Sequence, residues 1–168
     1  FNNDTNVIHP LRIQNSTKLE LEENLILCDT GISHNSGNIH NDQKKSMQNK
    51  DIDSLVKSNV DLTYQIKNQL LRGKLNEFGA SMDKAWEYKR KFSSSISSPE
   101  IDHIYNEVKK SGAIGGKLLG AGGGGFFLFY IDPFKRQQVV KKLEKMNLRI
   151  FRFIFDDLGL QTWKTREE

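Results

Sequence analysis

Hydrophobic residues recur every three or four positions through the middle of this chain and again nearer its end, which is the spacing of amphipathic helices. Gly73 separates the first two helical segments. A third begins at Ser98-Pro99, a typical helix start, and ends at Ser111-Gly112. Pro133 opens a fourth. The expected helices cover residues 43–71, 75–92, 99–110 and 133–146.

Short apolar or alternating runs outside these helices predict strands. "FFLFYI" is compact and apolar, which indicates a buried strand, and "LRIFRFIF" alternates arginine with apolar residues, as a half-buried strand does. The expected strands cover residues 7–13, 19–28, 126–131, 148–155 and 160–163. Because the helices are grouped between strands and do not strictly alternate with them, the pattern predicts a single α+β domain over residues 1–168.

Composition narrows the class of partner. The formal net charge is +4, but the 25 lysines and arginines are scattered among 21 acidic residues, which disfavours nucleic acid and permits an anionic ligand. No apolar run reaches the roughly 20 residues that span a bilayer. Cys28 is the single cysteine and is expected to be a small buried hydrophobic residue. A cytoplasmic protein is expected, and because residue 1 is Phe, we expect it to be part of a longer one.

One stretch, Gly115 to Pro133, is unusually rich in glycine: "GGKLLGAGGGGFFLFYIDP". A cluster of this density is typical of positive φ angles or of close backbone approach. It matches GxGxxG, but a strand follows where a dinucleotide fingerprint needs a helix. The P-loop pattern fails as well, because Leu118 after Lys117 has no hydroxyl for Mg²⁺. Two hypotheses remain: an anion-binding concavity of backbone N–H groups, or a flexible turn leading into a core strand.

The surrounding sequence resembles a known family. "GAIGGKLLGAGGGGFFLFY" is similar to the third, glycine-rich motif of the GHMP superfamily of small-molecule kinases, such as galactokinase, homoserine kinase and mevalonate kinase. "LCDTGISHNSG" resembles a strand and loop early in the C-terminal half of that family. "AWEYKRKFSSSISSPEIDHIYNEVKKSGAIGGK" resembles the branch that phosphorylates D-glycero-D-manno-heptose 7-phosphate at its anomeric hydroxyl. The resemblance implies an antiparallel sheet of four to five strands with helices packed on one face, a ferredoxin-like C-terminal domain.

The same resemblance implies which residues bind. Lys117 is the best side-chain candidate for a phosphate contact, with a solvated lysine at a strand end as the alternative. Residues 89–91, Lys-Arg-Lys, are expected to be a solvated face, with the distal phosphate of the substrate as the alternative contact. No catalytic residue and no metal ligand is assigned. The candidate phosphate- or substrate-binding residues are Lys117, Gly120, Gly122, Gly123, Gly124, Gly125, Thr30, Gly31, Ser33 and His34.

The resemblance also implies what lies outside this chain. An N-terminal domain, expected upstream of residue 1, would bind most of the ATP and Mg²⁺, so the chain alone is expected to be inactive. The expected partners are that N-terminal half and a sugar phosphate, without nucleic acid or membrane and with a homodimer as an alternative to the monomer. The alternatives for function are a non-catalytic metabolite-binding or regulatory module, or a GHMP kinase for another alcohol of the galactose, fucose or mevalonate type.

Overall fold

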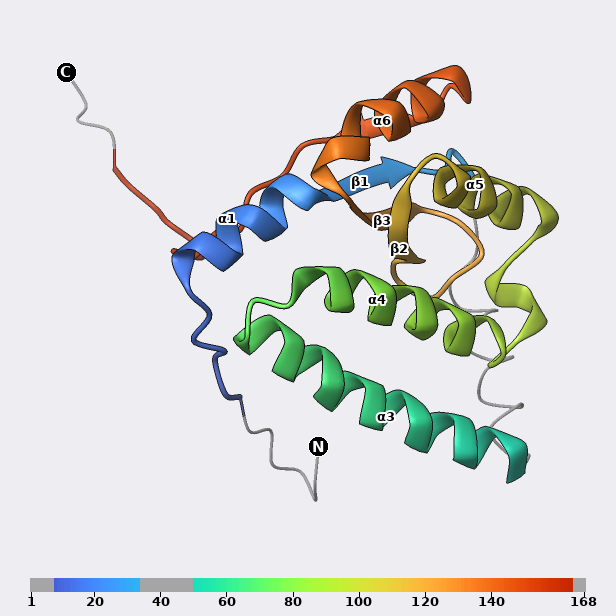
Figure 1. The fold of residues 1–168 in the computed structure, drawn as a ribbon, viewed down its shortest axis with the longest axis horizontal. Helices are drawn as coiled ribbons and strands as arrows, with labels where there is room; N and C mark the ends of the chain where they lie inside the picture. Colours follow the sequence, from blue (N-terminus) through green and yellow to red (C-terminus); the bar gives the residue numbers. More distant parts are fainter. Residues whose placement is uncertain (1–7, 34–49, 165–168) are drawn as a thin grey trace.

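A four-stranded sheet surrounded by helices forms the body of the molecule (Figure 1). The computed structural model describes residues 8–33 and 50–164. In chain order the described elements are α1 (Asn15–Asn24), β1 (Leu25–Asp29), α3 (Lys50–Leu71), α4 (Leu75–Arg90), the 3₁₀ turn η1 (Ser94–Ile96), α5 (Pro99–Lys110), β2 (Ala113–Leu118), β3 (Phe126–Ile131), the 3₁₀ turn η2 (Pro133–Lys135), α6 (Arg136–Lys145) and β4 (Arg149–Phe151). None of the described helices is long and apolar enough to cross a membrane.

The sheet is antiparallel throughout, in the order β2-β3-β1-β4. Leu25 to Asp29 of β1 pair with Tyr130 to Phe126 of β3, and Leu118 of β2 pairs with Phe127. This arrangement confirms the fold class expected from the sequence, an α+β domain with an antiparallel sheet. It also brings three segments to one end of the sheet: the ends of β1 and β2 and the start of β3.

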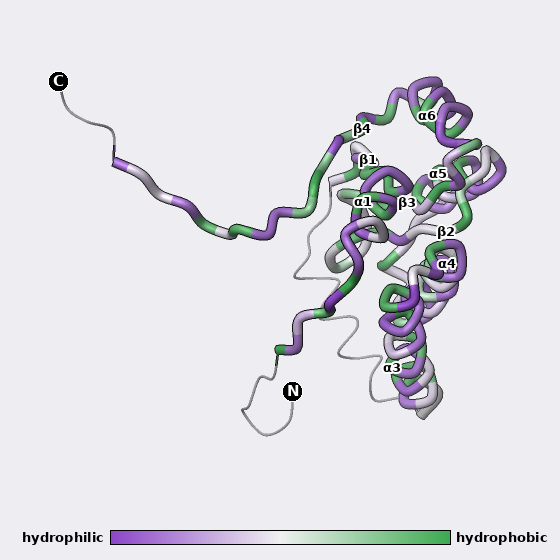
Figure 2. The backbone as a smooth tube through the Cα atoms, turned by 60° about the vertical axis from the view of Figure 1, so that its left-hand side comes forward, coloured by the Kyte–Doolittle hydropathy of each residue, from purple (hydrophilic) through white to green (hydrophobic). Residues whose placement is uncertain are grey.

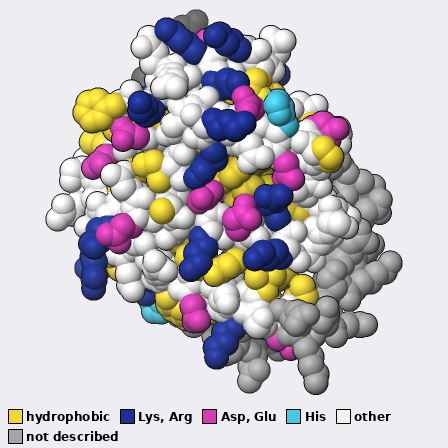
Figure 3. All heavy atoms as spheres, turned by 45° about the vertical axis from the view of Figure 1, so that its right-hand side comes forward, with side chains coloured by type: hydrophobic (Ala, Val, Ile, Leu, Met, Phe, Trp, Pro, Cys, Tyr) yellow, Lys and Arg dark blue, Asp and Glu magenta, His cyan; other side chains and the backbone are white. Residues whose placement is uncertain are grey.

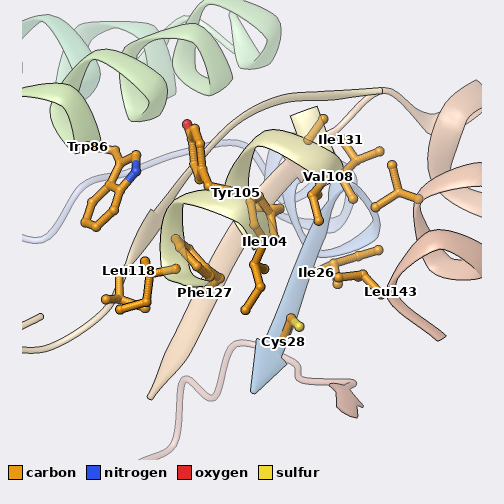
Figure 4. Close-up of a cluster of buried hydrophobic side chains, with 14 of the residues drawn as sticks. Ile26, Cys28, Trp86, Ile104, Tyr105, Val108, Leu118, Phe127, Ile131 and Leu143 are labelled. Atoms are coloured by element: carbon orange, nitrogen blue, oxygen red, sulfur yellow. The ribbon is translucent and has the colours of Figure 1, made fainter. Parts of the chain in front are cut away.

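The main core lies between one face of the sheet and helices α5 and α6 (Figure 4). Tyr105, Ile104 and Val108 of α5 point toward β1 and β3, and Leu143 of α6 packs beside Ile26. Trp86 of α4 completes this core: it is fully buried, with ring centroids 5.9 Å from Tyr105 and 5.7 Å from Phe127. The apolar faces predicted for residues 75–92 and 99–110 are therefore confirmed, as is the burial of Cys28.

The helix α4 lies against β2, with α3 alongside it (Figure 1). The contact is backbone to backbone, since a Cβ built on Gly115 of β2 would lie 2.0 Å from the Gly79 carbonyl oxygen of α4. Asp83 closes the same edge: it accepts a hydrogen bond from the Tyr105 hydroxyl and another, at 3.0 Å, from Lys109. Because of this close approach, α4 also reaches the opposite face of the sheet, where Leu75 and Met82 join a second buried cluster. The remaining members of that cluster are Leu21, Leu25 and Tyr130.

The strand β2 was not among the expected strands. Its sequence, "AIGGKL", contains two adjacent glycines, which are unfavourable in a strand unless something approaches closely. Both glycines have such a reason, because Gly115 faces α4 and a Cβ on Gly116 would lie 2.5 Å from the ring of Phe129. These two glycines make the strand hard to predict from the sequence. They are also the residues that allow it to pack against α4 and Phe129.

Two predictions near the start of the chain were wrong. Residues 8–14 form neither helix nor strand, where a strand over 7–13 was expected. The run "LELE" alternates like a strand, yet α1 occupies residues 15–24, and the strand begins only at Leu25. Helical spacing buries Thr17, Leu21 and Asn24 together and leaves Leu19 exposed, so packing favours the helix over the local alternation.

Other expectations were met in part. Described residues confirm the helices expected around 50–71, 75–92, 99–110 and 133–146, with Ser98 capping α5 through a bond from the Ile101 N–H. Residues 43–49 and the loop residues 34–42 lie outside the described part. The strand expected over 148–155 is limited to β4, and that over 160–163 was wrong. Beyond β4 the chain leaves the body as an extended tail (Figure 2).

Candidate functional site

The glycine loop, residues 119–125, connects β2 to β3 at the end of the sheet where β1 also finishes. Five of its glycines have positive φ, from +68° at Gly120 to +154° at Gly124, a region that side-chain-bearing residues rarely adopt. The Leu119 N–H donates to the Phe126 carbonyl at 2.8 Å and closes the loop at its base. Glycine is therefore required here by backbone conformation.

The loop is tied to its surroundings through alternate N–H groups. Gly123 donates to the Ile96 carbonyl of η1 at 2.8 Å, and Gly125 donates to the Ile32 carbonyl at 3.1 Å. These two N–H groups serve the fold and are not available to a ligand. In the part of the chain that the structure describes, the N–H groups of Gly120, Gly122 and Gly124 have no hydrogen-bond acceptor. Only these three of the five candidate glycines could donate to a phosphate without breaking an internal bond.

The segment after β1 lies directly beside this loop. Thr30 donates its N–H to the Gly125 carbonyl at 2.8 Å, opposite the bond from Gly125 to Ile32. The Thr30 side chain is buried and accepts from the Ile32 N–H at 3.2 Å, so its hydroxyl oxygen has a structural role. Gly31 and Ser33 are exposed at this edge. The structure thus brings together the two predicted groups of site residues, while His34 lies outside the described residues.

Two lysines approach the start of the loop. Lys117 lies on β2, opposite Leu128 of β3, and is partly exposed. Lys89, in the last turn of α4, donates through Nζ to the Leu118 carbonyl at 2.9 Å and to the Gly120 carbonyl at 2.6 Å. Burial, and then the positive charge of Lys117, lower the pKa of Lys89 to about 8. The end of β2 and the loop are therefore a cationic region.

The prediction from the sequence was wrong for Lys89, because residues 89–91 were expected to be a solvated face. Lys89 instead follows Trp86 by three positions, so it lies on the side of α4 that turns toward the core. The three-residue spacing from Trp86 to Lys89 is the feature of the sequence that could have indicated this position. Arg90 pairs with Asp102 at 2.9 Å and with Glu87 at 3.2 Å, which leaves Lys91 as the solvated member of the run. A distal phosphate would have to compete with two carboxylates for Arg90.

Charge elsewhere is mixed. On the face shown in Figure 3, basic and acidic side chains are interspersed and do not form one large patch of a single sign. An open, mainly apolar groove of about 560 Å³ lies beside Thr30, between the N-terminus of α5 and the turn before β4; His103 and Glu100 are among its lining residues. Within residues 8–33 and 50–164, no group of three or more His, Cys, Asp and Glu side chains is placed to hold a metal ion.

A family model decides the identity of this fold and loop. Residues 66–147, from the end of α3 to the turn before β4, match the model described as "GHMP kinases C terminal". The chain contains a GHMP kinase C-terminal domain. The matched range includes Lys89, Lys117 and the whole glycine loop, and it confirms the family to which the sequence was similar.

Relatives of this chain include sugar and mevalonate kinases. The chain is 30% identical over 165 residues to the D-glycero-alpha-D-manno-heptose 7-phosphate kinase of Campylobacter jejuni, covering 98% of this chain and 48% of that protein. A crystal structure of a putative sugar kinase from Campylobacter jejuni superposes with a TM-score of 0.70 at 28% identity, covering 97% of this chain and 45% of that one. Mevalonate kinase of L. major, in complex with R-mevalonate, gives 0.66 at 26% identity, with coverages of 72% and 37%. The chain spans about half the length of the heptose kinase.

Proposed function

We propose that this GHMP domain is the C-terminal half of an ATP-dependent sugar kinase that phosphorylates the anomeric hydroxyl of D-glycero-D-manno-heptose 7-phosphate. One observation carries the proposal: nearly the whole chain is 30% identical to a heptose 7-phosphate kinase, and the glycine loop falls within the matched family domain. We further propose that the protein acts in the cytoplasm and that an N-terminal nucleotide-binding half precedes residue 1.

The geometry of the loop suits phosphoryl transfer. In this reaction charge spreads over the oxygens of the transferred group, so catalysis depends mainly on positioning and electrostatic stabilisation. Lys117 would supply a cation at the phosphate, and the N–H groups of Gly122 and Gly124 would donate hydrogen bonds beside it. Ser33 and Gly31 would border the sugar, since both are exposed next to Gly125.

The residues of this half suit the phosphates of ATP better than they suit Mg²⁺. ATP, when bound, supplies the phosphoryl group, and its phosphates suit the cationic, N–H-bearing loop described above. Mg²⁺ prefers carboxylate oxygens and water, and Lys89 and Lys117 are the wrong donors for it. We therefore assign the metal and most of the nucleotide to the N-terminal half.

The test is ATP consumption by the chain together with the N-terminal half that we propose precedes it. Heptose 7-phosphate should be turned over by the combined halves and by neither half alone. Lys117→Met should then lower kcat/KM by roughly tenfold or more, which corresponds to about 1.4 kcal/mol of lost stabilisation. Lys141→Met, on the exposed side of α6, is the matched control and should change nothing. A lack of turnover with heptose 7-phosphate by the combined halves would rule out the proposed substrate.

A second candidate is a GHMP kinase for another alcohol, favoured by the superposition on a mevalonate kinase bound to R-mevalonate. The same assay with mevalonate, galactose and fucose as acceptors separates it from the first. The remaining alternative, a non-catalytic metabolite-binding module, predicts calorimetric binding of a sugar phosphate by the 168-residue chain alone. It also predicts no turnover with any of these acceptors by the combined halves.

A further inference from the structure

Lys89 joins two parts of the fold that are far apart in the chain. It lies at the C-terminal end of α4, and its Nζ donates to the carbonyls of Leu118 and Gly120, 29 and 31 residues further on. One carbonyl ends β2 and the other lies in the first turn of the glycine loop. A single ammonium group therefore connects the helix to the strand and to the loop.

Lys89 supplies the side-chain hydrogen bond to Gly120 in the first turn of the loop. A Cβ built on Gly120 would meet nothing within 4 Å, so no side chain packs against that side of the residue. Later parts of the loop are held by backbone bonds, from Gly123 to Ile96 and from Gly125 to Ile32. The contact from Lys89 thus fixes the part of the loop that lies nearest to Lys117.

Another cation lies near the Lys89 ammonium, and no acid in the described part of the chain pairs with it. Lys117 of β2 is the neighbouring charge, and it opposes protonation, as burial does. The glycine loop and η1 carry no ionisable side chain, and on α4 itself Glu87 and Arg90 pair with each other. In the described part of the chain no carboxylate pairs with Lys89. Its bonds to the two carbonyls are charge-assisted only while the ammonium is protonated.

We propose that Lys89 is a positioning residue, whose side-chain nitrogen holds the first turn of the glycine loop in place through its hydrogen bonds to the Leu118 and Gly120 carbonyls. A neutral amine can still donate to a carbonyl, through bonds that are about half as strong as charge-assisted ones. Because burial and Lys117 lower the pKa of Lys89 to about 8, the folded state accommodates the neutral amine better than the unfolded chain does, so deprotonation should not release the loop. The consequence for phosphoryl transfer rests on the proposed function, whereas the loop geometry does not.

Amide hydrogen exchange of the full 168-residue chain, followed by NMR, tests this directly. The reporter of the first turn is the N–H of Leu119, and the N–H groups of Gly123 and Gly125, which are held by separate backbone bonds, are internal controls. At pH 7, Lys89→Met should lower the protection factor of Leu119 by roughly tenfold, the loss expected for one hydrogen bond to a charged group. Lys89→Arg should keep the protection, because guanidinium is also cationic. Lys91 lies two residues after Lys89 and is exposed. Lys91→Met is therefore the matched control and should have the same protection factors as the wild type.

The rescue by Lys89→Arg is the readout that a merely space-filling side chain would not give, and a pH series adds a second one. From pH 6.5 to 9.5 the wild-type protection factor of Leu119 should not fall, because the lowered pKa of Lys89 means that the ordered fold favours the neutral amine. If Lys89→Met keeps full protection, or if Lys89→Arg loses as much as Lys89→Met, the proposal is overturned. Should Lys89→Met not fold, the comparison of the wild type with Lys89→Arg decides. No kinase assay is involved, so a failure of the proposed function leaves this result unaffected.

Discussion

At the scale of single residues, the absence of a side chain at Gly115 allows α4 to approach the sheet closely. A methyl group there would lie 2.0 Å from the Gly79 carbonyl oxygen and 2.8 Å from the Asp83 nitrogen, both backbone atoms that cannot rotate away. Gly115→Ala should therefore lower the free energy of unfolding by about 3 kcal/mol, the upper part of the range for overpacking. Urea denaturation followed by circular dichroism measures this difference.

Gly159→Ala provides the control for that substitution. A Cβ at Gly159 meets nothing within 4 Å, and its φ of +63° adds only a left-handed backbone penalty of about 1 kcal/mol in an exposed tail. Equal losses of stability in the two variants would contradict the steric account of the contact between α4 and β2.

Cys28 should be chemically silent in the folded protein. Its side chain is fully buried, and burial followed by the charge of Asp29 raises the pKa of the thiol to about 12. Because only the thiolate reacts with disulfide reagents, the native chain should react with such a reagent at pH 8 far more slowly than the chain in urea. Rapid labelling of the native chain, at the rate of the unfolded one, would show that β1 opens readily.

At the scale of elements, Glu107 connects α5 to α6. It accepts hydrogen bonds from Lys142 of α6 and from Lys110, and these lower the pKa of the carboxyl to about 2. Stability gained from a lowered carboxyl pKa is complete above the unfolded value near 4.3 and disappears as the pH falls toward 2. Glu107→Gln should thus reduce the free energy of unfolding at pH 7 and leave it nearly unchanged at pH 2.

Chemical denaturation at the two pH values measures this effect. Glu144→Gln, on the exposed side of α6, is the matched control and should be neutral at both. A loss of stability for Glu107→Gln that is as large at pH 2 as at pH 7 would assign the effect to packing and not to charge.

The elements differ in how far the sequence could predict them. The helix α5 was predicted to the residue, because Ser98, Pro99 and Ser111-Gly112 mark its ends with local chemistry. The strand β2 was missed, because Gly115 and Gly116 are explained only by partners distant in sequence. The helix α1 was misread since its leucines alternate like a strand, and only tertiary packing distinguishes Leu21 from Leu19.

The candidate site, too, was predictable from the sequence only in part. The glycine loop and Lys117 could be found from a contiguous pattern, whereas Thr30 was named as a candidate only through family resemblance. Its position beside Gly125 emerged from the structure. No local signal indicated that Gly123 and Gly125 donate inside the fold, or that Lys89 accompanies the loop. Both depend on η1 and α4 reaching the loop from distant parts of the chain.

At the scale of the whole molecule, the described part of the chain has a packed body and an extended C-terminal tail (Figure 2). The two tryptophans, Trp86 in the body and Trp163 in the tail, report on them separately. The tail is attached to α1, where Lys18 pairs with Asp157 and the Phe155 N–H donates to Glu22 at 2.7 Å. Past that point the large apolar side chains are exposed, and Trp163 is 81% exposed, whereas Trp86 is fully buried in the main core.

Alanine substitutions at these two positions should therefore have very different costs. Trp86→Ala should lower the free energy of unfolding by about 3–5 kcal/mol, because it leaves a cavity between Tyr105 and Phe127. Trp163→Ala should change it by less than about 0.5 kcal/mol. Urea unfolding of both variants measures the difference, and the fluorescence of Trp163→Ala reports Trp86 alone. A large loss of stability in Trp163→Ala would mean that the tail packs on the body in solution.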